Sequence, residues 1–166
     1  MSYDPRLGYP EPVYDGDGEV TAFVRPDRTP PELGFLPGNT VDYLATHSAT
    51  SGAFGLYRWN FGPHVSGPDP HFHRTISESF YILSGSLQIH DGQEWRTTTT
   101  GDFVHVPPGG VHGFRNESGE PASMLLLFTP GAAREEYFET LFAGGTGGMS
   151  EEEKAAFYLR HDNYWV

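Results

Sequence analysis

The chain of 166 residues contains no cysteine. Disulfide bonds, thiolate zinc sites and iron–sulfur clusters all need cysteine sulfur, so the sequence excludes them. As an indicator of compartment, the absence is neutral or weakly in favour of the cytoplasm.

Basic residues are scarce as well: 10 Lys and Arg stand against 22 Asp and Glu, for a formal net charge of −12. Such a charge disfavours a nucleic-acid partner, because the phosphate backbone attracts basic surfaces. Long apolar runs are also missing, and the longest, Met124–Phe128, is far too short to span a bilayer. Met1–Pro5 lacks the basic and then apolar pattern of a secretory signal. We therefore expect a soluble, cytoplasmic protein with no membrane partner.

Glycine and proline, in contrast, are abundant, with 21 and 14 residues. With an aromatic fraction of 14%, they favour one packed domain of short strands and tight turns over disorder. The hydrophobic period is close to two along most of the chain, as in half-buried strands. The predicted strands are Glu19–Val24, Thr40–Ala45, Phe54–Phe61, Glu78–Leu83, Ser86–His90, Glu94–Thr99, Asp102–Val106, His112–Asn116 and Ala122–Thr129. Their number and even spacing indicate an all-β sandwich or barrel.

The two ends of the chain differ from this middle part. Residues 1–17 are rich in Pro, Gly and Tyr and are expected to form an N-terminal arm, followed by a barrel over residues 18–130. Arg25–Gly38 contains four prolines and is predicted to be a surface loop. Residues 131–166 are expected to form a helical segment that packs on the barrel.

Two helices are predicted in the C-terminal segment. Ala132–Ala143 places aromatic and aliphatic side chains on one helical face, and Gly144–Gly148 then ends the helix. Ser150 followed by Glu153 has the spacing of a capping box and predicts a second helix to about Leu159. The helices either cover the outside of the barrel or cap its mouth, with the glycine run as the hinge of a lid.

Four residues have the types and spacing of a metal site. These are His71, His73, Glu78 and His112. Three imidazoles and one carboxylate form a ligand set for one divalent transition metal, which can be Fe, Ni, Mn, Cu, Co or Zn. Each of the two blocks that contain these residues also carries glycine or proline at defined positions, which scattered surface histidines would not show.

Strand geometry indicates how these ligands can converge. His71 and His73 are two residues apart and therefore share a face in a strand. Glu78 lies five residues further on, at odd parity, so a bend near Thr75–Ser77 must turn it inward. Asn116 follows in the second block, where we expect it to make a structural hydrogen bond in a turn.

The two blocks resemble the paired signature of the cupin superfamily. The first matches from His71 to Gly85, although the family's leading glycine would fall on Val65, between Gly62 and Gly67. The second matches at each of its defining positions, which are Gly101, Pro107, Gly109, His112 and Asn116. The resemblance implies a single-domain jelly-roll β-barrel with a metal at its centre, bound by the four residues above.

The segments Ser66–His73, Glu78–Gly85 and Gly101–Gly109 are further similar to the quercetin 2,3-dioxygenase-like cupins. This resemblance implies a mechanism in which the metal holds an enolate oxygen of the substrate and O₂ attacks the activated carbon skeleton. In that scheme Glu78 is both a ligand and the base that takes a hydroxyl proton. Two alternatives stay open: a non-redox isomerase, cyclase or lyase, and a cupin that binds a small molecule without catalysis.

Seven residues are candidates for the wall of a substrate pocket. They are Tyr57, Trp59, Phe80, Phe103, His105, Phe114 and Phe128. Cations near the motifs are few, which favours an aromatic or otherwise apolar small molecule over a phosphorylated one or a dicarboxylate. The strand at Phe80–Leu83 is apolar on both faces, so the arm, the helices or a second subunit must cover its outer side. Because cupins of this kind commonly pair, we expect a homodimer.

Overall fold

Strands with period-two patterning form the centre of the structure, a computed structural model that describes residues 8–35 and 38–166. In β10 (Ala122–Thr129), every second side chain from Ala122 to Phe128 is buried. This strand pairs antiparallel with β3 (Gly55–Phe61) on one side and with β5 (Ser77–Ser84) on the other. The alternation therefore places one face of the sheet toward the core.

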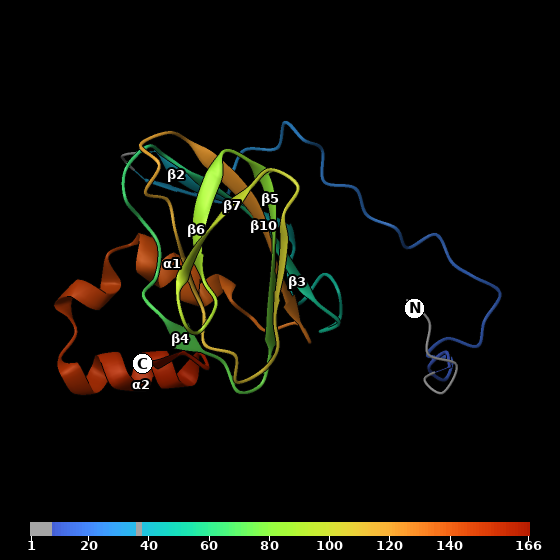
Figure 1. Ribbon diagram of the computed structural model, residues 1–166. Helices are drawn as coiled ribbons and strands as arrows, with labels where there is room; N and C mark the ends of the chain where they lie inside the picture. The colour runs from blue at the N-terminus through green and yellow to red at the C-terminus, as the bar shows by residue number, and fades with distance from the viewer. Residues whose placement is uncertain (1–7, 36–37) are drawn as a thin grey trace.

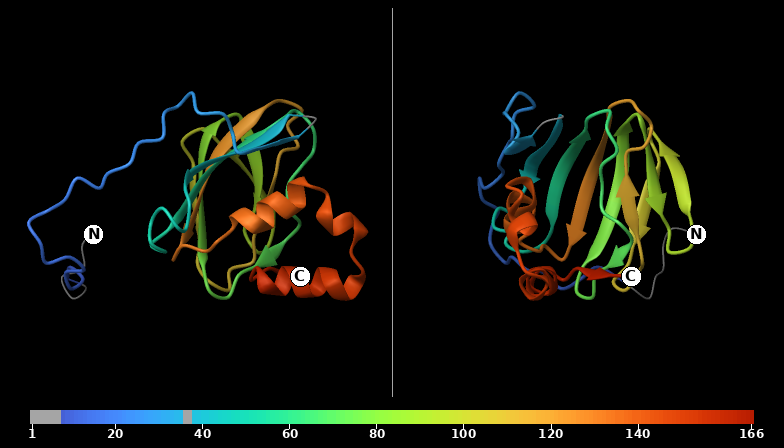
Figure 2. Two further views of the ribbon diagram at one scale, coloured as in Figure 1. Left: turned by 180° about the vertical axis from the view of Figure 1, so that it is seen from behind. Right: turned by 90° about the vertical axis from the view of Figure 1, so that its left-hand side faces the viewer.

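Two sheets face each other and form the barrel (Figure 1; Figure 2). The larger has the order β1 (Leu33–Phe35), β2 (Asn39–Ala45), β3, β10, β5 and β8 (Phe103–Val106). The smaller has the order β7 (Trp95–Thr99), β6 (Ser86–His90) and β9 (Gly113–Arg115). Side chains from both sheets meet in the core, where the Phe80 and Phe114 rings pack edge to face at 5.5 Å between centroids. The predicted all-β jelly-roll barrel is confirmed.

The two predicted C-terminal helices are also present. They are α1 (Glu135–Phe142) and α2 (Glu151–Arg160), joined by the short 3₁₀-helix η1 (Gly145–Gly148). Ser150 accepts a hydrogen bond from the backbone of Glu153, whose side chain accepts one from the backbone of Ser150, so the capping box is confirmed. Both helices lie on the side of the barrel away from the N-terminal segment (Figure 1; Figure 2). No helix in the described ranges is long and apolar enough to cross a lipid bilayer.

Three predictions about elements were wrong or incomplete. Glu19–Val24 is not a strand: it belongs to an exposed segment that leaves the barrel, and alternation alone cannot hold a strand without a partner (Figure 1). The predicted loop Arg25–Gly38 contains β1, which pairs with β2. A final strand, β11 (Tyr164–Trp165), pairs with β4 (His71–Phe72) and was too short to show a period. Residues 1–7 of the predicted arm lie outside the described residues.

Candidate metal centre

The predicted bend between His73 and Glu78 is present. His71 begins β4 and His73 follows it directly, whereas Glu78 lies on β5, and the chain bends at residues 74 and 75 between them. The carboxylate of Asp162 holds this bend, because it accepts hydrogen bonds from the backbone N–H of Arg74 at 3.0 Å and of Thr75 at 2.8 Å. The bend turns Glu78 to the same side as the two histidines, as the parity argument required.

A second contact brings His112 to the same place. His71 and His112 exchange backbone hydrogen bonds of 2.8 Å each, and Ser66 and Asn116 pair further along the same two segments. Gly67 lies at this crossing with φ of +142°, and a Cβ there would be 1.9 Å from the carbonyl oxygen of Phe114. Of the two glycines that flank Val65, Gly67 is thus the one that this close approach requires.

Asn116 makes the structural hydrogen bonds that the sequence predicted for it, beside the same crossing. Its buried side-chain amide donates to the carbonyl oxygens of Gly62 at 2.9 Å and Glu120 at 2.7 Å. Its oxygen accepts from the backbone and the hydroxyl of Ser118. It therefore fixes the turn and is not a metal ligand.

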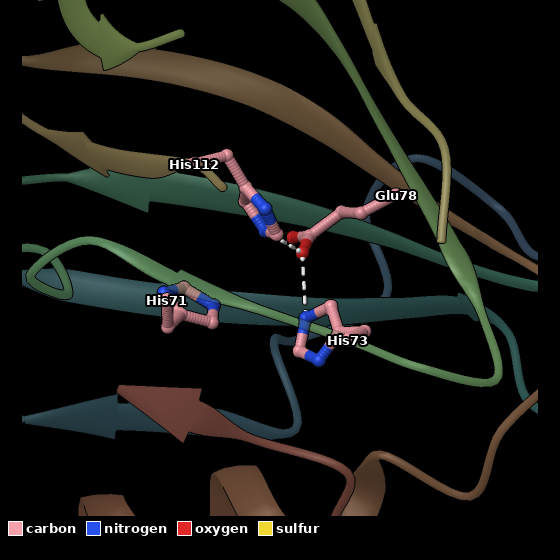
Figure 3. A group of neighbouring side chains, drawn as sticks. All are labelled: His71, His73, Glu78 and His112. Carbon is pink, nitrogen blue, oxygen red and sulfur yellow. Dashed lines mark hydrogen bonds and ion pairs between the residues drawn. The ribbon is translucent and has the colours of Figure 1, made fainter. Parts of the chain in front are cut away.

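The four candidate ligands form one buried cluster (Figure 3). One ligand atom from each of His71, His73, Glu78 and His112 lies within 4.8 Å of those of the other three. The Oε2 atom of Glu78 is 3.2 Å from Nε2 of His73 and 2.9 Å from Nε2 of His112. This donor set can hold one metal ion, because nitrogen and carboxylate oxygen atoms converge on one point in a site shielded from water.

Backbone carbonyl groups orient all three imidazoles. The Nδ1 atoms of His71, His73 and His112 lie 2.9, 2.7 and 2.9 Å from the carbonyl oxygens of Asp69, Asp162 and Gly110, respectively. A carbonyl oxygen only accepts, so each Nδ1 donates to it and each Nε2 is the atom that faces the cluster. In His73 and His112 this Nε2 donates to Glu78, and it would give up that proton to a bound metal ion. This arrangement is typical of histidine ligands, whose outer nitrogen is held by a second group.

The charges of the cluster also suit a metal cation. Burial lowers the pKa of His71 to about 4, so its imidazole is neutral near pH 7 and its Nε2 lone pair is free. Burial alone would raise the pKa of Glu78, but hydrogen bonds from His112 and His73 outweigh it and hold that pKa well below its usual range. Burial disfavours a charged His112, yet its hydrogen bond to Glu78 raises the pKa of His112. The site thus contains a buried carboxylate anion that a metal ion can neutralise.

Comparison with known proteins agrees with this geometry. The sequence profile of the cupin domain matches residues 57–128, the range that contains all four candidate ligands. Over these residues the chain is similar to cupin domains. The chain is also 39% identical to quercetin 2,3-dioxygenase of Bacillus subtilis over 99 residues. The match covers 59% of this chain but only 28% of the Bacillus enzyme.

Solved structures with the same fold include a predicted oxalate decarboxylase from Thermotoga maritima. Its TM-score is 0.56 at 22% identity, and the match covers 64% of this chain and 97% of that one. A second structure with this fold is the polyketide cyclase RemF from Streptomyces resistomycificus, with a TM-score of 0.54 at 21% identity. The match covers 64% of this chain and 79% of the cyclase chain. At these identities the similarity shows the cupin fold and does not identify a reaction.

A cavity of about 250 Å³ opens beside the four candidate ligands. His71 and Glu78 line it, together with three of the predicted pocket residues, Trp59, Phe114 and Phe128. Tyr57 and Phe80 are fully buried but are not part of the cavity wall. The phenol of Tyr57 donates to Glu135 at 2.7 Å, and the Phe80 ring packs behind that of His112.

Phe103 and His105 do not line the cavity, contrary to prediction. Phe103 is 62% exposed, and His105 lies on the same outer face, where its Nδ1 is 2.9 Å from the hydroxyl of Ser79. In β8, Val106 is buried and Val104 is partly buried against the core, so Phe103 and His105, at the other parity, face away from it. In a short apolar run the sequence does not reveal which set of alternate residues faces the core. The prediction took Phe103 and His105 as the inward set, whereas Val104 and Val106 are.

Several cavity residues were missed because they come from the C-terminal segment. They are Arg134, Tyr137, Phe138, Leu141, Tyr158 and Trp165. The apolar face of the first predicted helix was a signal for its aromatic members, but it did not show that this face meets the metal site. Residues of both helices line the cavity, so the helices cap it, while the glycine run as the hinge of a lid stays a prediction.

Proposed function

We propose that this cupin is a metal-dependent dioxygenase that acts on a small, enolisable substrate with a largely aromatic body. The observation that carries the proposal is the buried cluster of three histidines and Glu78, open to a cavity with aromatic walls. The identity to the Bacillus quercetin 2,3-dioxygenase across the same part of the chain supports it.

The residues have distinct roles in this proposal. His71, His73 and His112 hold the metal through Nε2, and Glu78 is the fourth ligand. When bound, the ion supplies Lewis-acid polarisation of a substrate oxygen and the ability to react with O₂. Glu78 lies at the cavity wall, where its carboxylate can accept the proton of a substrate hydroxyl. The apolar walls exclude water from the site and orient the substrate.

The proposal is tested by elemental analysis of the purified chain, followed by an oxygen-electrode screen of quercetin, other flavonols and other enolisable aromatic compounds. We expect one transition-metal ion per chain and O₂ consumption that depends on both metal and substrate. His112→Ala should lose the ion, whereas His105→Ala, which changes an exposed histidine outside the cavity, should keep it.

Substrate turnover without O₂ consumption would refute the dioxygenase proposal in favour of an isomerase, cyclase or lyase. Full metal retention in His112→Ala would refute the ligand assignment itself. An absence of turnover of any compound in the screen would instead favour a binding protein.

A further inference from the structure

Arg134 is a buried cation in the wall of the cavity that contains the metal ligands. It immediately precedes α1, its side chain is only 4% exposed, and it lines the cavity together with Glu78 and His71. Among the described residues that line this cavity, Arg134 is the only Lys or Arg. The arginines nearest the sequence motifs do not line this cavity; they are Arg58, Arg74, Arg96 and Arg115.

The hydrogen bonds of Arg134 leave its charge without a counter-ion. Its guanidinium donates to the carbonyl oxygen of His161 at 2.7 Å and to the side-chain oxygen of Asn163 at 3.2 Å. Within the part of the chain that the structure describes, no carboxylate forms an ion pair with Arg134, and its Nε has no hydrogen-bond partner. The Tyr137 ring at 4.1 Å and the more distant Glu78 and Asp162 carboxylates favour the buried charge, but no carboxylate pairs with the guanidinium directly.

A second donor in the same wall is also without a partner. Nε1 of Trp59 is buried and makes no hydrogen bond in the described structure, and Trp59 lines the cavity. The remaining wall is mainly apolar and aromatic. The guanidinium of Arg134 lies over two of its rings, 4.1 Å from the centroid of Tyr137 and 5.3 Å from that of Phe128. The cavity thus combines apolar surface with unpaired donors and offers few acceptors to a ligand.

The charge balance of the site points the same way. A divalent ion, the Glu78 carboxylate and the Arg134 guanidinium together leave a formal charge of about +2 in a site walled by apolar side chains. A neutral substrate would leave that charge uncompensated, whereas an anionic one would reduce it. A phosphate dianion normally meets several cations, so a single guanidinium fits a carboxylate better.

We propose that the substrate is a carboxylate anion with an aromatic or otherwise apolar body, and that Arg134 binds its carboxylate while another oxygen of the substrate faces the metal ligands. This inference rests on the proposed function, since it names the substrate class of the same site. It adds a single carboxylate to the aromatic or otherwise apolar small molecule that the sequence predicted.

The test compares two probes of nearly the same size, 3,4-dihydroxybenzoate and 3,4-dihydroxybenzamide, of which the amide lacks the charge and has an N–H₂ donor in place of one acceptor oxygen. Both carry the same pair of hydroxyl groups for the metal, so any difference between them reports on the carboxylate. Binding is measured by calorimetry on the zinc-loaded chain, because Zn²⁺ has no redox chemistry and permits no oxidative turnover. We expect wild type to bind the acid roughly 10–100-fold more tightly than the amide, the usual effect of a charge-assisted pair.

Arg134→Gln should abolish this preference for the acid, because the charge-assisted contact is lost. Its affinity for the amide should stay within about threefold of the wild-type affinity. Arg160→Gln is the matched control: it makes the same chemical change at an exposed arginine that pairs with Glu136 and does not line the cavity. It should retain the full preference for the acid. If Arg134→Gln does not fold, Arg134→Lys, which keeps the charge, should retain part of it.

Equal affinity of wild type for acid and amide would overturn the inference. So would a preference that survives in Arg134→Gln, or an equal weakening of both probes, which would assign Arg134 only a structural role at residues 161–163. Zinc content is measured in the same samples. A chain that takes up no zinc contradicts the metal-dependent function, and the same comparison on the metal-free chain then decides the role of Arg134.

Discussion

At the scale of single residues, Glu78 differs from the other three ligands in what it can do. The histidines have one nitrogen held by a backbone carbonyl group and one nitrogen left for the metal. Glu78 is the only carboxylate of the cluster and also lines the cavity. It can therefore both neutralise the ion and accept a proton from the substrate, whereas each imidazole can only bind the ion.

Glu78→Gln separates these two roles, because glutamine keeps the size and one oxygen but loses the charge and nearly all the basicity. We expect metal affinity to fall but to be restored by excess metal, while turnover stays roughly 10²–10⁴-fold below wild type, the usual contribution of a positioned base. Steady-state rates at saturating metal are the measurement. Glu94→Gln, in an exposed hairpin, is the control. Near-normal turnover of metal-saturated Glu78→Gln would show that Glu78 is a ligand only.

At the scale of elements, residues 161–166 pack against the candidate metal centre. β11 pairs with β4, and the carbonyl oxygen of Asp162 accepts a hydrogen bond from Nδ1 of His73. Trp165 lies with its ring centroid 5.2 Å from that of His71 and forms part of the cavity wall. The end of the chain thus orients two ligands that lie some ninety positions earlier in the sequence.

Asp162→Ala tests this contribution. The substitution removes the carboxylate that holds the backbone of Arg74 and Thr75 but leaves all four ligands in place. We expect metal affinity to fall by roughly 10–100-fold, as is usual when a group that orients a ligand is lost. Competition with a chromophoric chelator provides the measurement. Asp91→Ala removes a similar backbone cap from the hairpin at Gln93 and Glu94 and should leave affinity unchanged. An unaltered affinity in Asp162→Ala would contradict the role of the C-terminal segment.

At the scale of the whole molecule, one apolar face of the barrel is uncovered. Tyr81 is 44% and Leu83 36% exposed on β5, and the more exposed Phe103 lies on β8, the edge strand beside it. Neither the helices nor the described part of the N-terminal segment covers these side chains. An exposed apolar patch at a sheet edge is typical of a surface that binds another chain.

We therefore expect a homodimer that forms through this face. Phe103→Asp should shift the mass measured by light scattering from dimer toward monomer, because it places a charge in an apolar interface. Leu159→Asp changes an exposed apolar residue of α2 and should leave the dimer intact. A wild-type chain that is monomeric at every accessible concentration would contradict the homodimer, and a dimer that tolerates Phe103→Asp would place the interface elsewhere.

Local chemistry is sufficient to predict much of this protein from its sequence. Most strands between Thr40 and Thr129 follow from period-two alternation, because one face of each lies toward the core; the two-residue strand β4 was not predicted. The capping box at Ser150 follows from two residues three positions apart. The candidate ligands also follow from the sequence, since their residue types, spacing and odd parity at Glu78 are properties of short segments.

The remaining features were decided by the tertiary structure, because they depend on which distant segments meet. Parity cannot show that Phe103 and His105 face outward, since that depends on which side of β8 the opposite sheet packs. Arg134 has no motif of its own and enters the cavity only because α1 packs across the barrel. Residue spacing thus determined which side chains can bind a metal, whereas the packing of the C-terminal segment decided what the cavity beside that metal can bind.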